Sequence, residues 1–296
     1  MTILNDIQSV QTRTFRFQSA GSEICGTLYL PVGHDGSALP GVVITGAWTT
    51  VEEQMPRTYA IELAARGLAA VTFDFRGWGK SGDLPDGRRF IESPAAKIED
   101  IRAAIAFAAG LPEIDQGRLH GLGICASSGY MIDAVAGNAA IAKVALIAPW
   151  LQNGEIVEAV YGGSEGVTAL IESSAAPEII SAAGPEGAEG VLMPIGGYYH
   201  EPDRGAIPAY DNKWNTASWA AWLTYLPAEN PGRLDKPLAL VHSDAAAIPD
   251  GARAFASGAT AQVDQHWLAG VTQFDFYDRP DAVTCAANIV ADHFIR

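Results

Sequence analysis

The chain has 296 residues, of which 48% are hydrophobic and 18% are charged, so it can bury the core of a large globular domain. Its net charge of −15 argues against nucleic acid and membrane surfaces as partners, because an acidic surface repels phosphate groups. No apolar run approaches the roughly 20 residues that span a bilayer, and the N-terminus lacks the basic and apolar regions of a signal peptide. The three cysteines form neither a metal-spaced pair nor a disulfide framework, which favours a cytoplasmic protein without a metal site.

The first half of the chain alternates between strand and helix patterns. Two segments of alternating polar and apolar residues, 12–17 and 24–30, predict an antiparallel hairpin at a sheet edge. Short apolar runs then predict strands that are buried on both faces of a parallel sheet. We expect such strands at 40–46, 69–73, 118–124 and 143–148, and helices at 52–66, 94–109 and 126–136.

This alternation stops near residue 150 and resumes near residue 234. The intervening segment, 151–233, is rich in aromatic residues and in glycine and proline clusters, which favours an inserted cap over a disordered loop. Residues 1–150 and 234–296 would then form one core, a doubly wound α/β fold with a mostly parallel sheet. The last predicted elements are strands at 237–243 and 262–268 and helices at 250–256 and 279–294.

One short stretch carries the strongest chemical signal. Residues 121–130 read GLGICASSGY and predict a strand, a tight turn and a helix, with Cys125 at the turn. This has the form Gly-x-nucleophile-x-small of a nucleophile elbow, which exposes its reactive side chain at the end of a strand. The N-terminus of the following helix favours a thiolate at Cys125. Cys25 and Cys285 lack such a context and are expected in the core.

At this point the chain resembles the α/β-hydrolase superfamily, and within it the bacterial group related to dienelactone hydrolases that has a cysteine elbow. The resemblance rests on GLGICASSGY and on three further motifs, FDFRGWGKSG (73–82), TTVEEQMPRTYA (49–60) and FDFYDRP (274–280). It implies that Cys125 is a nucleophile. It also implies an oxyanion hole formed by the backbone N–H of Ala126 and that of Ala47 or Trp48.

Two positions depart from the family pattern. Where the family has its histidine, in a Gly-x-x-His context, this chain has Gln273, which cannot take a proton from a thiol. Where the family has its acid, this chain has Ala246, and Asp244 lies two residues earlier. Asp244 could still serve as an acid or orient Gln273, and Gln273 could position water or a substrate carbonyl. The alternative for Asp244 is a carboxylate that caps a helix or serves its loop. The alternative for Gln273 is a neutral substitution in a degenerate site.

Other residues could contribute to the pocket. His242 ends a predicted strand at the edge where open α/β sheets form their sites. His200 could reach the pocket from the insertion, beside Tyr198 and Tyr199, and Trp214 could line it. For each histidine and aromatic residue the competing interpretation is a structural role in the core.

The sequence therefore predicts cysteine-dependent hydrolysis or acyl transfer on a small ester, lactone or thioester, with an incomplete triad. A non-hydrolytic enzyme, such as a lyase, isomerase or cyclase, and a non-catalytic small-molecule-binding protein stay open as alternatives. The elbow also nearly matches a dinucleotide fingerprint, but the next strand ends at Pro149 and Trp150 without an acidic residue, so no cofactor is expected. A homodimer is compatible with the sequence.

Overall fold

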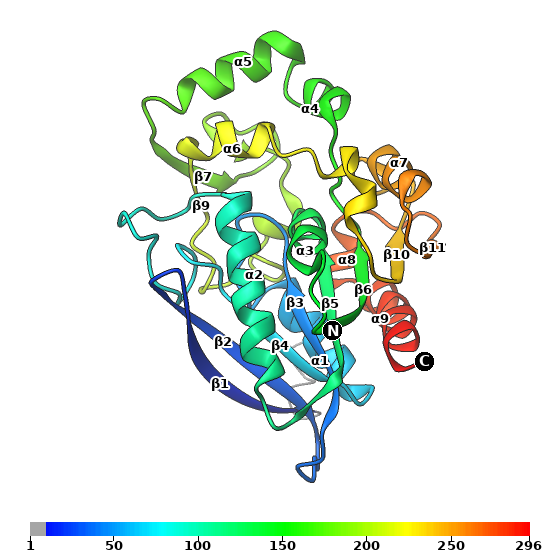
Figure 1. The fold of residues 1–296 in the computed structure, drawn as a ribbon. Coiled ribbons are helices and arrows are strands. Elements are labelled where there is room, and N and C mark those ends of the chain that lie inside the picture. The colour runs from blue at the N-terminus through cyan, green and yellow to red at the C-terminus, as the bar shows by residue number, and fades with distance from the viewer. Residues whose placement is uncertain (1–9) are drawn as a thin grey trace.

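The computed structural model describes residues 10–296, so the N-terminus in which no signal peptide was expected lies largely outside the described residues. Its centre is an eight-stranded sheet with the order β1-β2-β4-β3-β5-β6-β10-β11 (Figure 1). The pairs β1–β2 and β2–β4 are antiparallel, and the other neighbours are parallel. The strands are β1 (Val10–Ser19), β2 (Ser22–Pro31), β3 (Leu39–Thr45), β4 (Ala69–Phe73), β5 (Ile114–Ile124), β6 (Ile141–Ile147), β10 (Leu238–His242) and β11 (Val263–Trp267).

Helices cover both faces of this sheet. Helices α1 and α9 pack together on one face, and α2 and α3 pack together on the other. Because both faces are covered, the central strands consist of continuous apolar residues, as the sequence predicted. The helices of the core are α1 (Met55–Ala65), α2 (Pro94–Ala109), α3 (Ser127–Val135), α7 (Pro249–Gly258), α8 (Asp275–Asp278) and α9 (Pro280–Ile295).

The insertion, residues 151–233, contains a second sheet that the sequence analysis missed. This sheet has three short strands in the order β8-β7-β9, and it lies with the helices of the insertion beyond one end of the large sheet (Figure 1). Its strands are too short to show a period-2 pattern, which explains the omission. The elements are α4 (Gly154–Val160), α5 (Gly163–Ser173), β7 (Ile179–Ala183), β8 (Val191–Met193), β9 (Lys213–Asn215) and α6 (Trp219–Leu223), with short 3-10 turns between them.

The loop after β4 is fixed by a buried ion pair. The Arg76 guanidinium lies 2.6 Å from the carboxylate of Asp100 on α2, and both side chains are almost fully buried. Arg76 also donates to the hydroxyl of Ser19 at the end of β1. These contacts support a structural role for the loop motif.

Among residues 10–296, no helix has both the length and the apolar character needed to cross a bilayer.

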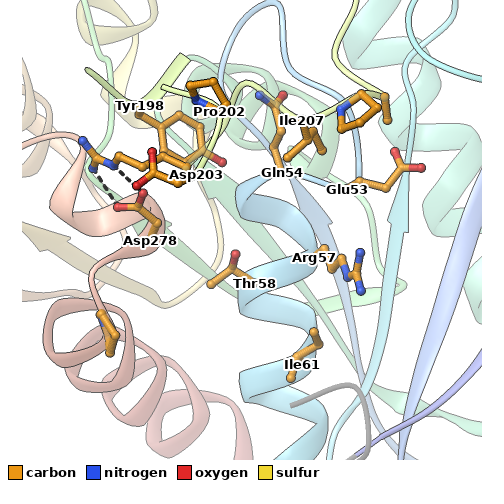
Figure 2. A pocket seen from close by; sticks show the side chains of 14 residues that line it. Glu53, Gln54, Arg57, Thr58, Ile61, Tyr198, Pro202, Asp203, Ile207 and Asp278 are labelled. Atoms are coloured by element: carbon orange, nitrogen blue, oxygen red, sulfur yellow. Dashed lines mark hydrogen bonds and ion pairs between the residues drawn. The ribbon is translucent and has the colours of Figure 1, made fainter. Parts of the chain in front are cut away.

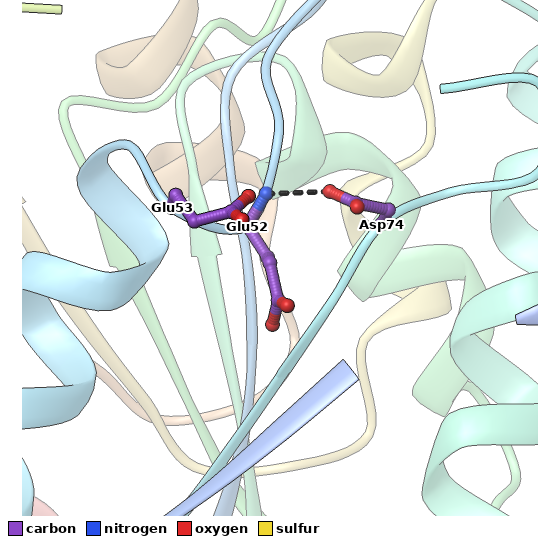
Figure 3. A group of neighbouring side chains, drawn as sticks. All are labelled: Glu52, Glu53 and Asp74. Atoms are coloured by element: carbon purple, nitrogen blue, oxygen red, sulfur yellow. Dashed lines mark hydrogen bonds between the residues drawn. The ribbon is translucent and has the colours of Figure 1, made fainter. Parts of the chain in front are cut away.

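Two buried carboxyl groups meet beside this loop (Figure 3). The backbone N–H of Glu52 donates to Asp74 at 2.7 Å, and the Glu52 side chain accepts from the hydroxyls of Thr27 and Thr72. Burial raises the pKa of Glu52 to about 7, against the hydrogen bond from Thr72. Burial likewise raises the pKa of Asp74 to about 6, against hydrogen bonds from backbone N–H groups. The folded protein therefore holds protons that an unfolded chain would release.

Glu53 brings a third carboxylate close to this pair, with ligand atoms of all three residues within 4.8 Å of one another. Lys80 neutralises Glu53, and its backbone N–H donates to Asp74. Hydroxyl and amide donors already contact the other two carboxyl groups, whereas the second carboxylate oxygen of Glu53 is buried without a hydrogen-bond partner among the described residues.

The free energy of unfolding is expected to contain a contribution from Glu52 and Asp74 that falls as pH rises from about 4 to about 8. Because both folded-state pKa values are raised, this contribution is complete below the unfolded pKa values and is lost as pH passes through 6 and 7. The shift at Glu52 alone corresponds to about 3 kcal/mol. Glu52→Gln should flatten the pH dependence by about that amount, as measured by denaturant unfolding at several pH values.

Asp292→Asn is the matched control, because Asp292 is an exposed carboxylate near the C-terminus that pairs only with Arg296 among the contacts described. Its pH dependence should follow that of the wild type. A Glu52→Gln variant with an unaltered pH dependence would show that this carboxyl group titrates alike in the folded and unfolded states.

Candidate active site

Cys125 occupies a strained turn between β5 and α3. Its φ of +55° lies in the left-handed region, which a residue with a side chain adopts only when the surrounding structure enforces it. The Cys125 N–H donates to Ile147 of β6, and its carbonyl accepts from the N–H of Ser128 and of Trp150. The thiol is buried, with 5% of the residue exposed. The turn therefore has the geometry of an elbow at the end of a central strand.

Glycine is required just before this turn. A Cβ at Gly123 would lie 2.8 Å from the carbonyl oxygen of Ser127 and 2.8 Å from the Cα of Ser128, both in the first turn of α3. The helix can begin directly behind the strand only because this position has no side chain.

The backbone N–H groups expected to form an oxyanion hole come from the residue after Cys125 and from the segment that follows β3. The backbone N–H of Ala126 lowers the pKa of the Cys125 thiol. Ala47 and Trp48 come directly after β3, the strand next to β5. In the described part of the chain, no backbone carbonyl outside helices and strands accepts from the N–H of Ala126, Ala47 or Trp48. These donors are therefore free of the usual backbone partners.

Gln273, where the resemblance implied a histidine, lies in the loop before α8. Its Oε1 accepts from the N–H of Ala247 at 3.1 Å. Its Nε2 donates to the carbonyl of Ala148 at 3.0 Å and to the hydroxyl of Tyr277 at 2.9 Å. These three contacts fix the amide in one orientation, and the polar groups of Gln273 and Tyr277 lower the pKa of the Cys125 thiol.

Tyr277 is the site residue that the sequence analysis missed. It lies on α8, with 1% of its surface exposed, and burial keeps its pKa well above the ordinary value, so it is a neutral phenol. The motif FDFYDRP contained it, four residues after Gln273, which lies in the turn just before α8. That spacing was the available signal.

The predicted thiolate is wrong for this structure. Burial raises the pKa of the Cys125 thiol to about 11, although the hydroxyl of Tyr277, the N–H of Ala126 and the amide of Gln273 all lower it. Desolvation therefore outweighs the field of the short helix α3. Cys285 also differs from its expected place in the core, since it is exposed, whereas Cys25 is buried as expected.

Three further polar residues were candidates for the site. The carboxylate of Asp244 pairs with Arg253 of α7, and 71% of its side chain is exposed, so it does not orient Gln273. Asp244 lies in the turn beyond the buried strand β10, where its side chain is exposed. His200 is exposed and does not reach inward from the insertion. His242 is fully buried, and burial lowers its pKa to about 4, so it is a neutral core histidine.

A cluster of tryptophans surrounds Trp48. Its ring centroid lies 4.8 Å from that of Trp222, 5.0 Å from that of Trp214 and 6.4 Å from that of Trp150. The Trp48 indole N–H also donates to the sulfur of Met193 in β8. Trp214 is fully buried within this cluster. The insertion thus packs directly on the segment that would supply one oxyanion donor.

Tyr198 and Tyr199 of the insertion are both buried and pack against Tyr277, with ring centroids 5.2 and 6.2 Å away. Tyr198 also lines a surface pocket of about 820 Å³ between α1 and residues 202–209 (Figure 2). An ion pair between Arg204 and Asp278 crosses one side of this pocket. Cys125 is not among the residues that line it.

No model of a known protein family matches the chain. Part of the chain is similar to the uncharacterized protein PA2218 of Pseudomonas aeruginosa, at 38% identity over 116 residues. Another part-length match is the polyketide transferase claH of Penicillium crustosum, at 30% identity over 110 residues. These matches cover 39% and 36% of this chain, but only 30% and 34% of the relatives, so the chain aligns with about a third of their length.

Solved structures match nearly the whole chain. The crystal structure of PA2218 has a TM-score of 0.82 at 25% identity and covers 97% of this chain and 93% of that one. The α/β hydrolase GrgF from Penicillium sp. sh18 has a TM-score of 0.73 at 15% identity, covering 97% and 100%. A dienelactone hydrolase from Anabaena variabilis has a TM-score of 0.58 at 11% identity, covering 97% and 98%, and a brefeldin A esterase one of 0.63 at 19%, covering 99% and 79%.

The chain therefore has the α/β-hydrolase fold, as the sequence predicted, and the similar solved structures include esterases and other hydrolases of that fold. The narrower resemblance, to a group with a cysteine nucleophile, stays a prediction.

Proposed function

We propose that this protein is an acyl-transfer enzyme in which Cys125 attacks the carbonyl of a small ester, lactone or thioester. One observation carries the proposal: Cys125 lies on a strained turn at the end of a central strand, where three polar groups lower the pKa of its thiol. These are the N–H of Ala126, the phenol of Tyr277 and the amide of Gln273. A structural cysteine in the core has no need of a strained backbone or of three polar neighbours.

Because the Cys125 thiol is protonated at rest, the first step must also move its proton. As the C–S bond forms, the carbonyl electron pair moves to the oxygen, which the N–H groups of Ala126 and of Ala47 or Trp48 stabilise. The bond to the leaving group then breaks as the carbonyl re-forms. The thiol proton passes to the departing oxygen or sulfur through Tyr277, whose hydroxyl accepts one proton and donates another. The products are an acyl thioester at Cys125 and the protonated leaving group.

The second step favours transfer over hydrolysis. Gln273 cannot act as a general base, so water near the acyl thioester is not activated by an imidazole, as it is in a complete triad. A thiol or hydroxyl held by the substrate itself is a better acceptor, because binding supplies the orientation that the base does not. The part-length similarity to a protein named polyketide transferase supports a transfer reaction.

The test is mass spectrometry after incubation with aryl esters, lactones and thioesters. Because deacylation by water is slow, we expect a covalent acyl adduct on Cys125 that accumulates with an activated ester. Cys285→Ser, which removes the exposed cysteine, should still form the adduct, and Cys125→Ala should not. Turnover that persists in Cys125→Ala would contradict the proposal. Ligand-induced stabilisation without adduct or turnover would identify a binding protein instead.

A further inference from the structure

A buried ion pair lies close to the candidate site and is used by nothing described so far. Glu92, in the loop before α2, and Lys97, in the first turns of α2, are 2.6 Å apart, with side-chain exposures of 0% and 2%. The ammonium also lies over the rings of Phe75 and Trp78. Burying two charges is costly, and an apolar pair of similar volume commonly serves stability as well or better. The pair therefore calls for a reason beyond packing.

The remaining contacts of Glu92 lead to the predicted oxyanion segment. One carboxylate oxygen accepts from the backbone N–H of Thr49 at 3.2 Å, and the other accepts from the hydroxyl of Tyr130 on α3 at 2.9 Å. Thr49 directly follows Trp48 and has a φ of +61°, which is strained for a β-branched residue. Glu92 thus joins the helix behind Cys125 to the strained residue beside the oxyanion donors.

The insertion also contacts Thr49 and the loop that contains Glu92. The Thr49 hydroxyl is 3.1 Å from the hydroxyl of Tyr210. The N–H of Glu92 donates to the hydroxyl of Ser218 at 2.9 Å, and the N–H of Asn215 donates to the carbonyl of Phe90 at 2.9 Å. Several independent contacts therefore maintain one strained arrangement, as expected where geometry serves function.

We propose that Glu92 is a positioning residue: its carboxylate fixes Thr49 and thereby aims the N–H groups of Ala47 and Trp48, while Lys97 cancels its charge. This inference rests on the proposed acyl transfer at Cys125. A carboxylate is the strongest side-chain acceptor for a buried backbone N–H group, because a hydrogen bond to an ionised group is stronger than one to a neutral group. Unpaired, the same carboxylate would oppose the negative charge that develops on the substrate oxygen, and Lys97 removes that opposition.

The electrostatic environment of Cys125 is consistent with this arrangement. The charge of Glu92 raises the pKa of the thiol, after the larger effect of burial. Burial lowers the pKa of Lys97, whereas the charges of Glu92, of Asp100 on α2 and of Cys125 raise it. The other titratable groups around the thiol are phenols that burial keeps neutral, namely Tyr130 of α3, Tyr277 of α8, and Tyr161 and Tyr199 of the insertion.

The charge relation is tested by the alkylation rate of Cys125 with iodoacetamide in a Cys285→Ser background, which removes the exposed thiol. Glu92→Gln leaves Lys97 unpaired, so the thiol pKa should fall and the rate at about pH 8 should rise about tenfold. Lys97→Met leaves Glu92 unpaired, so the rate should fall about tenfold. The double variant Glu92→Gln/Lys97→Met should return close to the wild-type rate. A purely structural pair would shift both single variants in the same direction, which would refute the proposed charge relation.

The positioning role is tested by two double variants that carry no unpaired charge. Glu92→Gln/Lys97→Met keeps an oxygen that can accept from Thr49, whereas Glu92→Met/Lys97→Met does not. In acyl transfer from an aryl ester, only the second should lose kcat, by about tenfold or more, with little change in KM. Equal kcat values in the two would refute positioning. If the wild type shows no acyl transfer, the proposed function fails, and the alkylation rates still decide the charge relation on their own.

Discussion

Gln273→His is expected to raise the alkylation rate of Cys125 at neutral pH by about 100-fold or more. With a thiol pKa of about 11, only about one molecule in 10⁴ carries a thiolate at pH 7. An imidazole at residue 273 would accept the thiol proton, and its second nitrogen could donate to the carbonyl of Ala148, which Gln273 contacts now. Iodoacetamide kinetics in the Cys285→Ser background measure the effect.

The same variant should gain hydrolysis of aryl esters, because an imidazole can also activate water against the acyl thioester. Gln273→Leu is the matched control, since it removes the hydrogen bonds and adds no base. Its alkylation rate should fall below that of the wild type, because Gln273 lowers the thiol pKa. A Gln273→His variant that reacts no faster than Gln273→Leu would show that residue 273 does not reach the sulfur, and would remove Gln273 from the site.

Gly123→Val is expected to destabilise the fold by about 4 kcal/mol or more, enough to unfold many single domains. A Cβ at Gly123 would collide with backbone atoms of Ser127 and Ser128 at 2.8 Å, and backbone at the start of a packed helix cannot shift as a side chain can. Either α3 moves away from β5 or the strand leaves its register. Denaturant unfolding followed by circular dichroism measures the loss.

Gly117→Ala is the control for this experiment. Its Cβ would meet only the carboxylate oxygen of Asp115, at 3.5 Å, which is ordinary contact. Its stability should stay within about 0.5 kcal/mol of the wild type. Should Gly123→Val unfold at the wild-type denaturant concentration, the close approach of α3 to β5 at the elbow would be refuted.

Much of the fold could be predicted from local patterns. The alternation in 12–17 and 24–30 predicted the hairpin formed by β1 and β2, and the apolar runs predicted the parallel strands. The helix predicted at 94–109 is α2, with Pro94 at its first position and Ser93 as its N-cap. These features depend on residues close in the chain, so their periodicity survives without knowledge of the fold. The insertion has no such period, and its small sheet was missed.

In the candidate site, too, some features follow from local sequence and others only from long-range packing. The position of Cys125 at a strand–helix turn follows from glycine and small residues around it, which is local information. Its protonation does not, because desolvation depends on everything packed over the sulfur, and it reversed the thiolate expected from the helix alone. Tyr277 and Glu92 become neighbours of the elbow only when α8 and the loop before α2 converge on it. Sequence patterns therefore located the proposed reactive atom, and long-range packing set its protonation state and its neighbours.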